Sequence, residues 1–261
     1  MSIRQIIAIA NQKGGVGKTT TAINIGAALT ELGHAVTLID LDPQGNASTG
    51  LGIKADQRDL TIYDILAGDA ELDSVAQQTN VLGLRVVPAT SDLSSAEAEF
   101  SQIPHRLRLL DRAVKRATGH DIVLIDCPPA LGLLTLNAMV AATSVLVPLQ
   151  AEFYALEGLS QLLATVKEVR NSANPALRIN GIILTMSDYR NNLSQQVEAD
   201  VRATLGELVY QTVIPRNVRV SESPSHSMPV LNYDPTSKGS QAYRHLAQEF
   251  AERLKLISET A

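Results

Sequence analysis

The feature that most constrains this chain is a glycine-rich loop between a short apolar run and a helical stretch near the amino terminus. Residues 6–10 form the apolar run, and residues 18–32 have helical period and stop at Gly33, a common helix end. The loop itself reads Lys13, Gly14, Gly15, Val16, Gly17, Lys18, Thr19 and Thr20. A strand, a glycine-rich loop and a helix in this order predict a phosphate-binding loop.

Each residue type in the loop suits phosphate chemistry. Glycines allow backbone N–H groups to turn toward phosphate oxygens, and the helix amino terminus adds positive potential. Lys18 is placed to reach the β and γ phosphates, and the Thr19 hydroxyl is suited to ligating Mg²⁺. The general motif has a glycine where this chain has Gln12, so the loop is a variant. The alternative is a plain glycine-rich turn before a helix, which the Lys-Thr pair disfavours.

Further apolar runs alternate with stretches of helical period, such as residues 105–118 and 156–172. The runs lack polar alternation, as expected of strands covered on both faces. We therefore predict one α/β domain over residues 1–261, a P-loop NTPase whose mostly parallel, twisted sheet of about seven to eight strands has helices on both faces. The expected strands after the first are residues 36–39, 84–87, 122–125, 145–149, 179–184 and 209–214.

Acidic residues follow two of these runs. Asp40 and Asp42 come directly after residues 36–39, and Asp126 comes after residues 122–125. Ligands of open α/β sheets bind beyond the carboxyl ends of the strands, so these carboxylates should converge there and serve metal and water positioning. For Asp40 and Asp42 the alternative is turn chemistry, because Pro43 and Gly45 follow them.

Composition excludes several classes of protein. The 22 basic and 27 acidic side chains give a net charge of −5, which argues against coating nucleic acid through the overall field but leaves a local basic patch open. The single cysteine, Cys127, cannot form an internal disulfide and fits a reducing cytoplasm. No uncharged apolar run reaches the ~18 residues of a membrane span, so no membrane partner is expected.

The lysine before the double glycine gives the loop a family likeness. The pattern K-G-G-x-G-K-T resembles the deviant Walker A ATPases, which include ParA, Soj, MinD and the nitrogenase iron protein. The resemblance implies ATP and Mg²⁺ as cofactors and an ATP-dependent homodimer in which Lys13 contacts the partner's nucleotide. It also implies that Asp42 orients the attacking water and that Asp126 holds Mg²⁺. Hydrolysis should be slow until a partner stimulates it, because no arginine lies in an obvious finger position.

The resemblance extends over nearly the whole chain. Residues 150–158 resemble the ParA/Soj segment after the fifth strand. Residues 214–226 resemble the segment that closes over adenine, which implies contacts from the Pro215 carbonyl and the Asn217 side chain. The same stretch also reads as a helix start with Ser221 as N-cap, and the two interpretations are compatible.

The ParA/Soj likeness implies a nucleoid-associated protein of the cytoplasm that binds DNA without sequence preference and responds to a ParB-like partner. Arg190 and Arg219 match the DNA-contacting positions, and Lys238 and Arg244 are candidates to add to them. Several cations on one face are needed to displace counterions from DNA phosphates. The alternative is that they are ordinary solvated surface side chains.

Other members of the superfamily fit less well. The nitrogenase iron protein needs two cysteines per subunit, and this chain has one. MinD needs a basic amphipathic helix at its end, whereas residues 248–261 are largely acidic or polar and suit a helix docked on the chain's own sheet. A MinD-like division regulator and a positioning ATPase for chemotaxis arrays or another assembly stay as alternatives. A metabolic ligase or reductase on this fold would need an extra substrate pocket, for which the sequence gives no sign.

Overall fold

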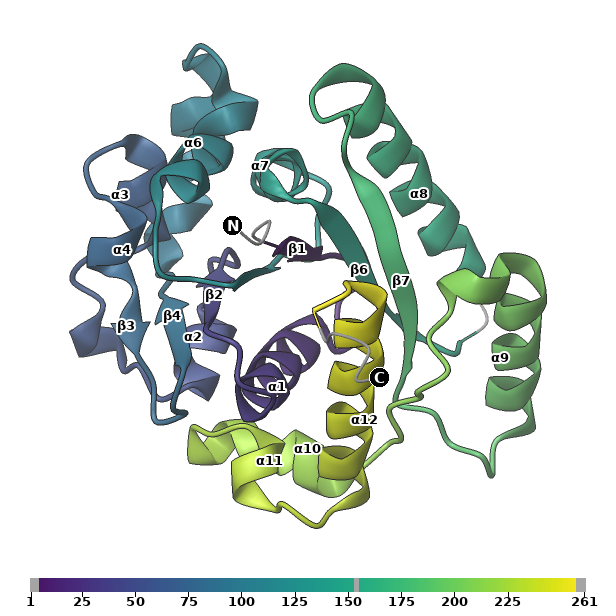
Figure 1. The fold of residues 1–261 in the computed structure, drawn as a ribbon. Helices are drawn as coiled ribbons and strands as arrows, with labels where there is room; N and C mark the ends of the chain where they lie inside the picture. Colours follow the sequence, from purple (N-terminus) through teal and green to yellow (C-terminus); the bar gives the residue numbers. More distant parts are fainter. Residues whose placement is uncertain (1–4, 153–154, 257–261) are drawn as a thin grey trace.

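A computed structural model describes residues 5–152 and 155–256, and this part of the chain forms a seven-stranded sheet (Figure 1). The strand order is β3-β4-β2-β5-β1-β6-β7, and all neighbours are parallel except β3 and β4. The fold class predicted from the sequence is confirmed. The strands are β1 (Gln5–Ile9), β2 (Val36–Asp40), β3 (Gln77–Gln78), β4 (Leu84–Val87), β5 (Ile122–Asp126), β6 (Ser144–Gln150) and β7 (Arg178–Thr185).

Helices cover both faces of the sheet because its strands are apolar on both sides. Ile7 and Ile9 of β1 pack into one core layer and Ala8 packs into the other. The first layer includes α1 and α12, which lie side by side in Figure 1, and the second includes α6, α7 and α8. The α-helices are α1 (Lys18–Glu31), α2 (Asn46–Gly50), α3 (Ile62–Ala67), α4 (Leu72–Val75), α5 (Ala96–Glu99), α6 (Leu109–Arg116), α7 (Leu133–Ala141), α8 (Ala155–Ser172), α9 (Asn192–Leu205), α10 (Val218–Glu222), α11 (Val230–Tyr233) and α12 (Lys238–Arg253).

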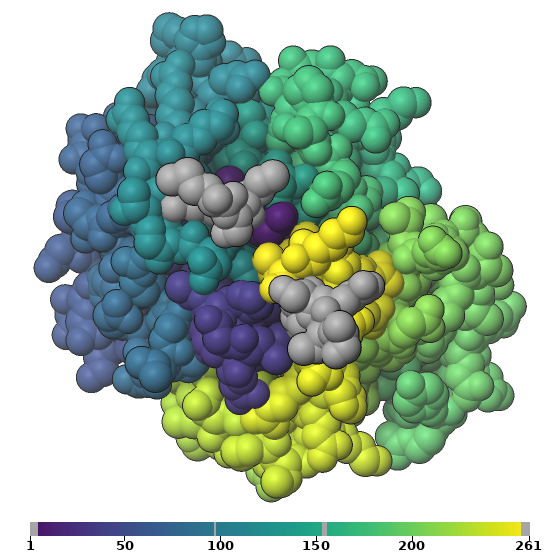
Figure 2. Space-filling view, viewed as in Figure 1, coloured from purple at the N-terminus to yellow at the C-terminus, as the bar shows by residue number. Residues whose placement is uncertain are grey.

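The first and last described helices, α1 and α12, lie close to elements from the middle of the chain. In the space-filling view the purple region of α1 lies between the yellow C-terminal region and the teal middle of the chain (Figure 2). Helix α12 docks on the molecule through side chains such as Phe250, which is fully buried, as expected for the C-terminal stretch. Residues 257–261 of that stretch lie outside the described residues. Among the helices that are described, none has the length and apolarity to cross a membrane.

The prediction of a strand over residues 209–214 is wrong. This segment runs beside β7 but bonds to it at separate points, through Tyr210 N to Ile182 O and Ile214 N to Leu184 O. Between these points the Glu249 carboxylate of α12 accepts hydrogen bonds from the N–H groups of residues 211 and 212. A side chain therefore takes the donors that a strand ladder would use, and apolar composition gave no sign of it. The seventh strand is instead β3, which has no apolar residue to indicate it.

Two predicted helices are placed correctly but begin differently. Residues 105–118 start as a 3₁₀ turn, Arg106–Arg108, and continue as α6, which ends at Arg116. His105 before the turn has a left-handed φ of 61°, which keeps it out of the helix. Residues 156–172 form α8, which starts one residue earlier.

We predict that Glu249→Ala lowers the free energy of unfolding by ~1–3 kcal/mol, because two backbone N–H groups lose their acceptor. Burial opposes the charge of Glu249, but the hydrogen bonds from residues 212 and 211 outweigh it and hold the pKa of this carboxyl below its usual value. Its contribution is therefore present above the ordinary glutamate pKa and lost as the pH falls through the lowered one. Urea titrations at several pH values measure the effect. Glu252→Ala, at an exposed position of the same helix, is the control, and an equal loss in both variants would contradict this account.

Candidate functional site

The carboxyl ends of three neighbouring strands meet at one edge of the sheet, as the sequence predicts. Asp126 at the end of β5 is the register partner of Asp40 in β2 and of Ile9 in β1. The glycine-rich loop leaves β1 at the same edge and enters α1. The fold therefore brings the loop and the acidic residues together, although Asp126 is more than a hundred positions from the loop in the sequence.

The loop has the backbone form that phosphate binding requires. Gly15 and Gly17 have left-handed φ values of 75° and 87°, a conformation that favours glycine. A Cβ added at Gly14 or Gly15 would meet no atom within 4 Å, so the space above the loop is open. No side chain caps the amino end of α1, whose first N–H groups are thus available to an anion.

Two strands on one side of β1 hold the loop. The Asn11 side chain donates to Pro148 O at 2.8 Å and accepts from Lys13 N at 3.0 Å. The Thr185 hydroxyl at the end of β7 donates to Val16 O at 2.8 Å. The loop is therefore tied to β6 and β7, and its shape does not depend on its own sequence alone.

Lys18 is the first residue of α1, and its side chain folds back against the glycine-rich loop. Its side chain is largely buried, and its ammonium donates to Lys13 O at 2.9 Å. Burial lowers the pKa of Lys18, while the nearby charges of Asp126 and Asp42 oppose that shift. The ammonium is thus desolvated and close to two carboxylates, which places a cation where phosphate oxygens would meet the loop.

Asp126 is fully buried, and neither of its carboxylate oxygens has a hydrogen bond of normal geometry. Burial and the neighbouring charge of Asp40 raise its pKa well above the usual value, although the Thr19 side chain lies close enough to favour the charged form. A buried carboxylate without donors is costly unless a cation compensates it. With the Thr19 hydroxyl beside it, this donor set fits Mg²⁺, a hard cation that prefers oxygen ligands.

Asp40 has a different role from Asp126, because its oxygens already have partners. They accept hydrogen bonds from Ser48 N, from the Ser48 hydroxyl and from Asp42 N. Burial raises the pKa of Asp40 to about 6, against the opposing effect of the Ser48 bonds. For Asp40, these contacts agree with turn chemistry, the alternative to metal and water positioning that the sequence left open.

Asp42 stands in the turn that Asp40 holds. It is half-buried, and its Oδ1 accepts from Gln44 N at 3.0 Å. Arg58, which the sequence analysis missed, braces this turn from outside by donating to Ala89 O and to the Thr49 hydroxyl. The turn approaches it so closely that a Cβ at Gly45 would lie 2.4 Å from the Arg58 guanidinium. The carboxylate predicted to orient water is therefore on a supported turn near Lys18.

A cavity of about 160 Å³ opens beside the glycine-rich loop. Pro215 and Asn217 line it together with Thr20 and Met186, so the two predicted adenine contacts lie next to the loop. The predicted N-cap is wrong: Asn217, not Ser221, caps α10 by accepting from the N–H groups of residues 219 and 220.

Lys13 forms an ion pair within its own chain, with Glu152 just after β6. Gln12 beside it donates to Gly158 O and to the Gln161 side chain of α8. Both contacts were missed from the sequence, because they join positions about 140 residues apart. They connect the loop to residues 150–158, although Phe153 and Tyr154 of that segment lie outside the described residues.

The candidate DNA-contacting arginines lie near two adjacent loops, one after β7 and one before α10. Arg190 follows β7 and pairs with Asp188, and Arg219 of α10 pairs with Glu222 and Asp234. The two loops meet because Arg216 N donates to Ser187 O. The two additional candidates, Lys238 and Arg244, have different surroundings. Lys238 borders a groove that Tyr189 and Pro215 also line. Arg244 is bound to both carboxylate oxygens of Glu31 and is already engaged.

Comparison with known proteins gives consistent relatives. The model of a family described as AAA domain matches residues 4–179. Chromosome partitioning protein ParA of Caulobacter vibrioides is 57% identical over 252 residues, which cover 95% of this chain and 94% of that protein. Sporulation initiation inhibitor protein Soj of Bacillus subtilis is 51% identical over 248 residues, which cover 95% and 98%.

Among solved structures, cobyrinic acid a,c-diamide synthase from Mycobacterium smegmatis with bound ADP and magnesium is 40% identical, with a TM-score of 0.85. The match covers 97% of this chain and 96% of that chain.

We predict two opposite effects of Asp126→Asn. Because the folded-state pKa of Asp126 is raised, its charge costs stability at pH 7, and its removal should raise the melting temperature of the nucleotide-free protein by about 2–4 °C. The variant should lose the extra stabilisation that ADP with Mg²⁺ gives over ADP with a chelator. Thermal melts in the three conditions measure both effects. Asp121→Asn, at the other end of β5, should keep the Mg²⁺ increment, and a full increment in Asp126→Asn would exclude a metal site there.

Proposed function

This chain belongs to the family of ParA and Soj chromosome-partitioning proteins, and we propose that it is a slow Mg²⁺-dependent ATPase of DNA segregation. ATP binding drives the formation of a homodimer that binds DNA without sequence preference. A ParB-like partner stimulates hydrolysis and resets the switch.

One observation carries the ATPase proposal: the donor-free carboxylate of Asp126 lies beside Thr19 and Lys18 at the mouth of an open glycine loop. Two oxygen ligands and a buried ammonium at a helix amino terminus form a site for a phosphate–metal complex. Bound Mg²⁺ would neutralise the charge that develops on the phosphates. The cavity beside the loop that Pro215 and Asn217 line supports a role for these two residues in holding the base of the nucleotide.

The chain's own residues supply positioning and not a covalent nucleophile. Lys18 and the N–H groups of the loop would bind the phosphates, Thr19 and Asp126 would hold the metal, and Asp42 would orient the attacking water. Cys127 does not take part, because burial raises the pKa of its thiol far above neutrality. We infer slow turnover until a partner contributes charge, because no arginine stands at an obvious finger position in the sequence.

Dimer formation depends on Lys13. Its side chain is about half exposed and pairs with Glu152, so the pair is weak enough to open in water. The phosphates bound to a second subunit offer Lys13 a stronger anionic partner than Glu152. When Lys13 changes partner, it would hold the two subunits together face to face. Arg190 and Arg219 from both subunits then provide four cations for the DNA backbone.

Two alternative functions would serve other processes. A positioning ATPase for a chemotaxis array or another assembly would use the same ATP-binding site and the same dimerisation. A metabolic ligase, the class of the similar Mycobacterium smegmatis synthase, would need a small-molecule substrate. We favour partitioning because the curated relatives with that name share more identity, 57% and 51% against 40%.

We predict that Lys18→Ala abolishes nucleotide binding, because the loop loses its only buried cation among the described residues. Asp42→Ala should keep ATP affinity within about twofold but lower the hydrolysis rate ~100-fold, since it removes the group that orients water. Equilibrium binding of a fluorescent ATP analogue and a phosphate-release assay separate the two effects. Normal phosphate release by Asp42→Ala, or unchanged ATPase in Lys18→Ala, would overturn these roles.

We predict that DNA co-sedimentation requires ATP, Lys13 and Arg219. Lys13→Ala should stay monomeric by light scattering with a non-hydrolysable triphosphate and should not pellet with DNA. Arg219→Glu should dimerise normally but bind DNA at least about tenfold more weakly at low salt, because each dimer loses two phosphate contacts. Arg178→Glu carries the same charge change at the far end of β7 and should bind like wild type. Equal DNA binding with and without ATP would contradict the proposal that the nucleotide controls DNA binding.

A further inference from the structure

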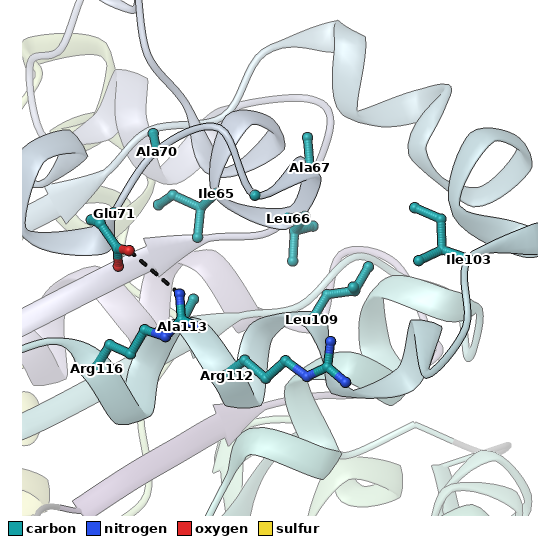
Figure 3. A pocket seen from close by; sticks show the side chains of 11 residues that line it. Ile65, Leu66, Ala67, Ala70, Glu71, Ile103, Leu109, Arg112, Ala113 and Arg116 are labelled. Atoms are coloured by element: carbon teal, nitrogen blue, oxygen red, sulfur yellow. Dashed lines mark hydrogen bonds and ion pairs between the residues drawn. The ribbon is translucent and has the colours of Figure 1, made fainter.

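A groove lies between α3 and α6, formed by elements that take no part in the nucleotide site. It encloses about 270 Å³ and is shown in Figure 3. Its floor is apolar: Ile65 and Leu66 come from α3, Leu109 and Ala113 from α6, and Ile103 closes one end. Within the described part of the chain, no segment fills this space.

Two arginines stand along the α6 side of the groove, one helical turn apart (Figure 3). Arg112 is exposed, and its guanidinium has no hydrogen bond or ion pair with any residue in 5–152 or 155–256. Arg116 has only a long contact with Glu71 across the groove, at 3.5 Å between side chains that are 70% and 63% exposed. A pair of this kind adds little stability, so the cations are available to a ligand.

Two neighbouring cations, one in the 3₁₀ turn before α6 and one in α6 itself, are used differently. Arg108 and Lys115 both pair with Asp111, a largely buried carboxylate of α6. That contact supports the helix itself, whereas Arg112 has no partner among the described residues, Arg116 has only Glu71, and both border an apolar floor. The basic rim also contrasts with the net charge of −5 of the whole chain. Local charge of the opposite sign to the rest of the molecule points to an acidic ligand.

We propose that this groove binds an acidic amphipathic peptide segment of a partner protein. Aliphatic side chains of the segment cover the floor, and two carboxylates one helical turn apart meet Arg112 and Arg116, displacing Glu71. This is the helix-in-groove mode of peptide recognition, with apolar anchors and a charged rim. Nucleic acid fits less well, because a phosphate backbone would pair with the arginines but leave the apolar floor in water.

The test starts from a phage-displayed library of random peptides, panned on the immobilised wild-type protein. We expect the enriched sequences to combine Leu, Ile or Met with Asp or Glu at helical spacing. The best of them, synthesised with a fluorescent label, should bind in solution with an affinity that falls at least tenfold in the double variant Arg112→Glu with Arg116→Glu. Glu71→Gln should bind the peptide more tightly, since it removes the competing carboxylate. Lys167→Glu, an exposed charge reversal on α8, is the matched control and should bind like wild type.

Several results would overturn the proposal. One is the enrichment of no acidic apolar peptide, or of peptides that bind the double variant as well as wild type. A second is a double variant that loses affinity for duplex DNA, which would assign the arginines to nucleic acid. A third is a double variant that no longer dimerises with ATP, which would make the groove an interface between two copies. The melting temperature and ATPase activity of the double variant should equal those of wild type, so this test does not depend on the proposed ATP switch.

Discussion

The arrangement of this molecule depends on two buried carboxylates that its sheet places side by side. Asp40 and Asp126 end neighbouring strands in the same register, and burial raises the pKa of each. Two like charges in a dry environment are unfavourable unless each is compensated. Asp40 is compensated inside the chain by Ser48, whereas Asp126 is not. The carboxylate of Asp126, which is not compensated, marks the place where a bound ligand would have to supply positive charge.

Local sequence predicts the parts of this site that are local in origin. The loop from Lys13 to Thr20 and the acids that end β2 and β5 follow from short segments whose chemistry and neighbours agree. The contacts that support the site cannot be predicted in this way. Glu152 reaches Lys13 and Arg58 reaches Ala89 only because the sheet brings distant segments together. Nothing at these positions distinguishes them from ordinary surface residues in the sequence. The same reason explains the missed contact of Glu249, which changes a predicted strand into a loosely bonded segment.

One segment of the sequence, residues 214–226, led to two predictions: contacts with adenine and an N-cap at Ser221. The structure contradicts only the second. Residues 214–226 contain several polar residues suited to capping, and Ser221 is a good N-cap by composition. The backbone turns earlier because Arg216 N bonds to Ser187 O beside β7, which makes Asn217 the cap. The tertiary contact therefore decides between candidates that local preference leaves nearly equal.

The position of Asn217 joins the nucleotide cavity to the candidate DNA surface. Its side-chain oxygen caps α10, the helix that carries Arg219, while the residue itself lines the cavity beside the loop. On the other side, Thr185 bonds to the loop at Val16 and ends the strand that leads to Arg190. Both arginines thus follow directly from elements that contact the nucleotide site. A ligand that contacts both Asn217 and the loop would therefore meet the two segments that lead to these arginines.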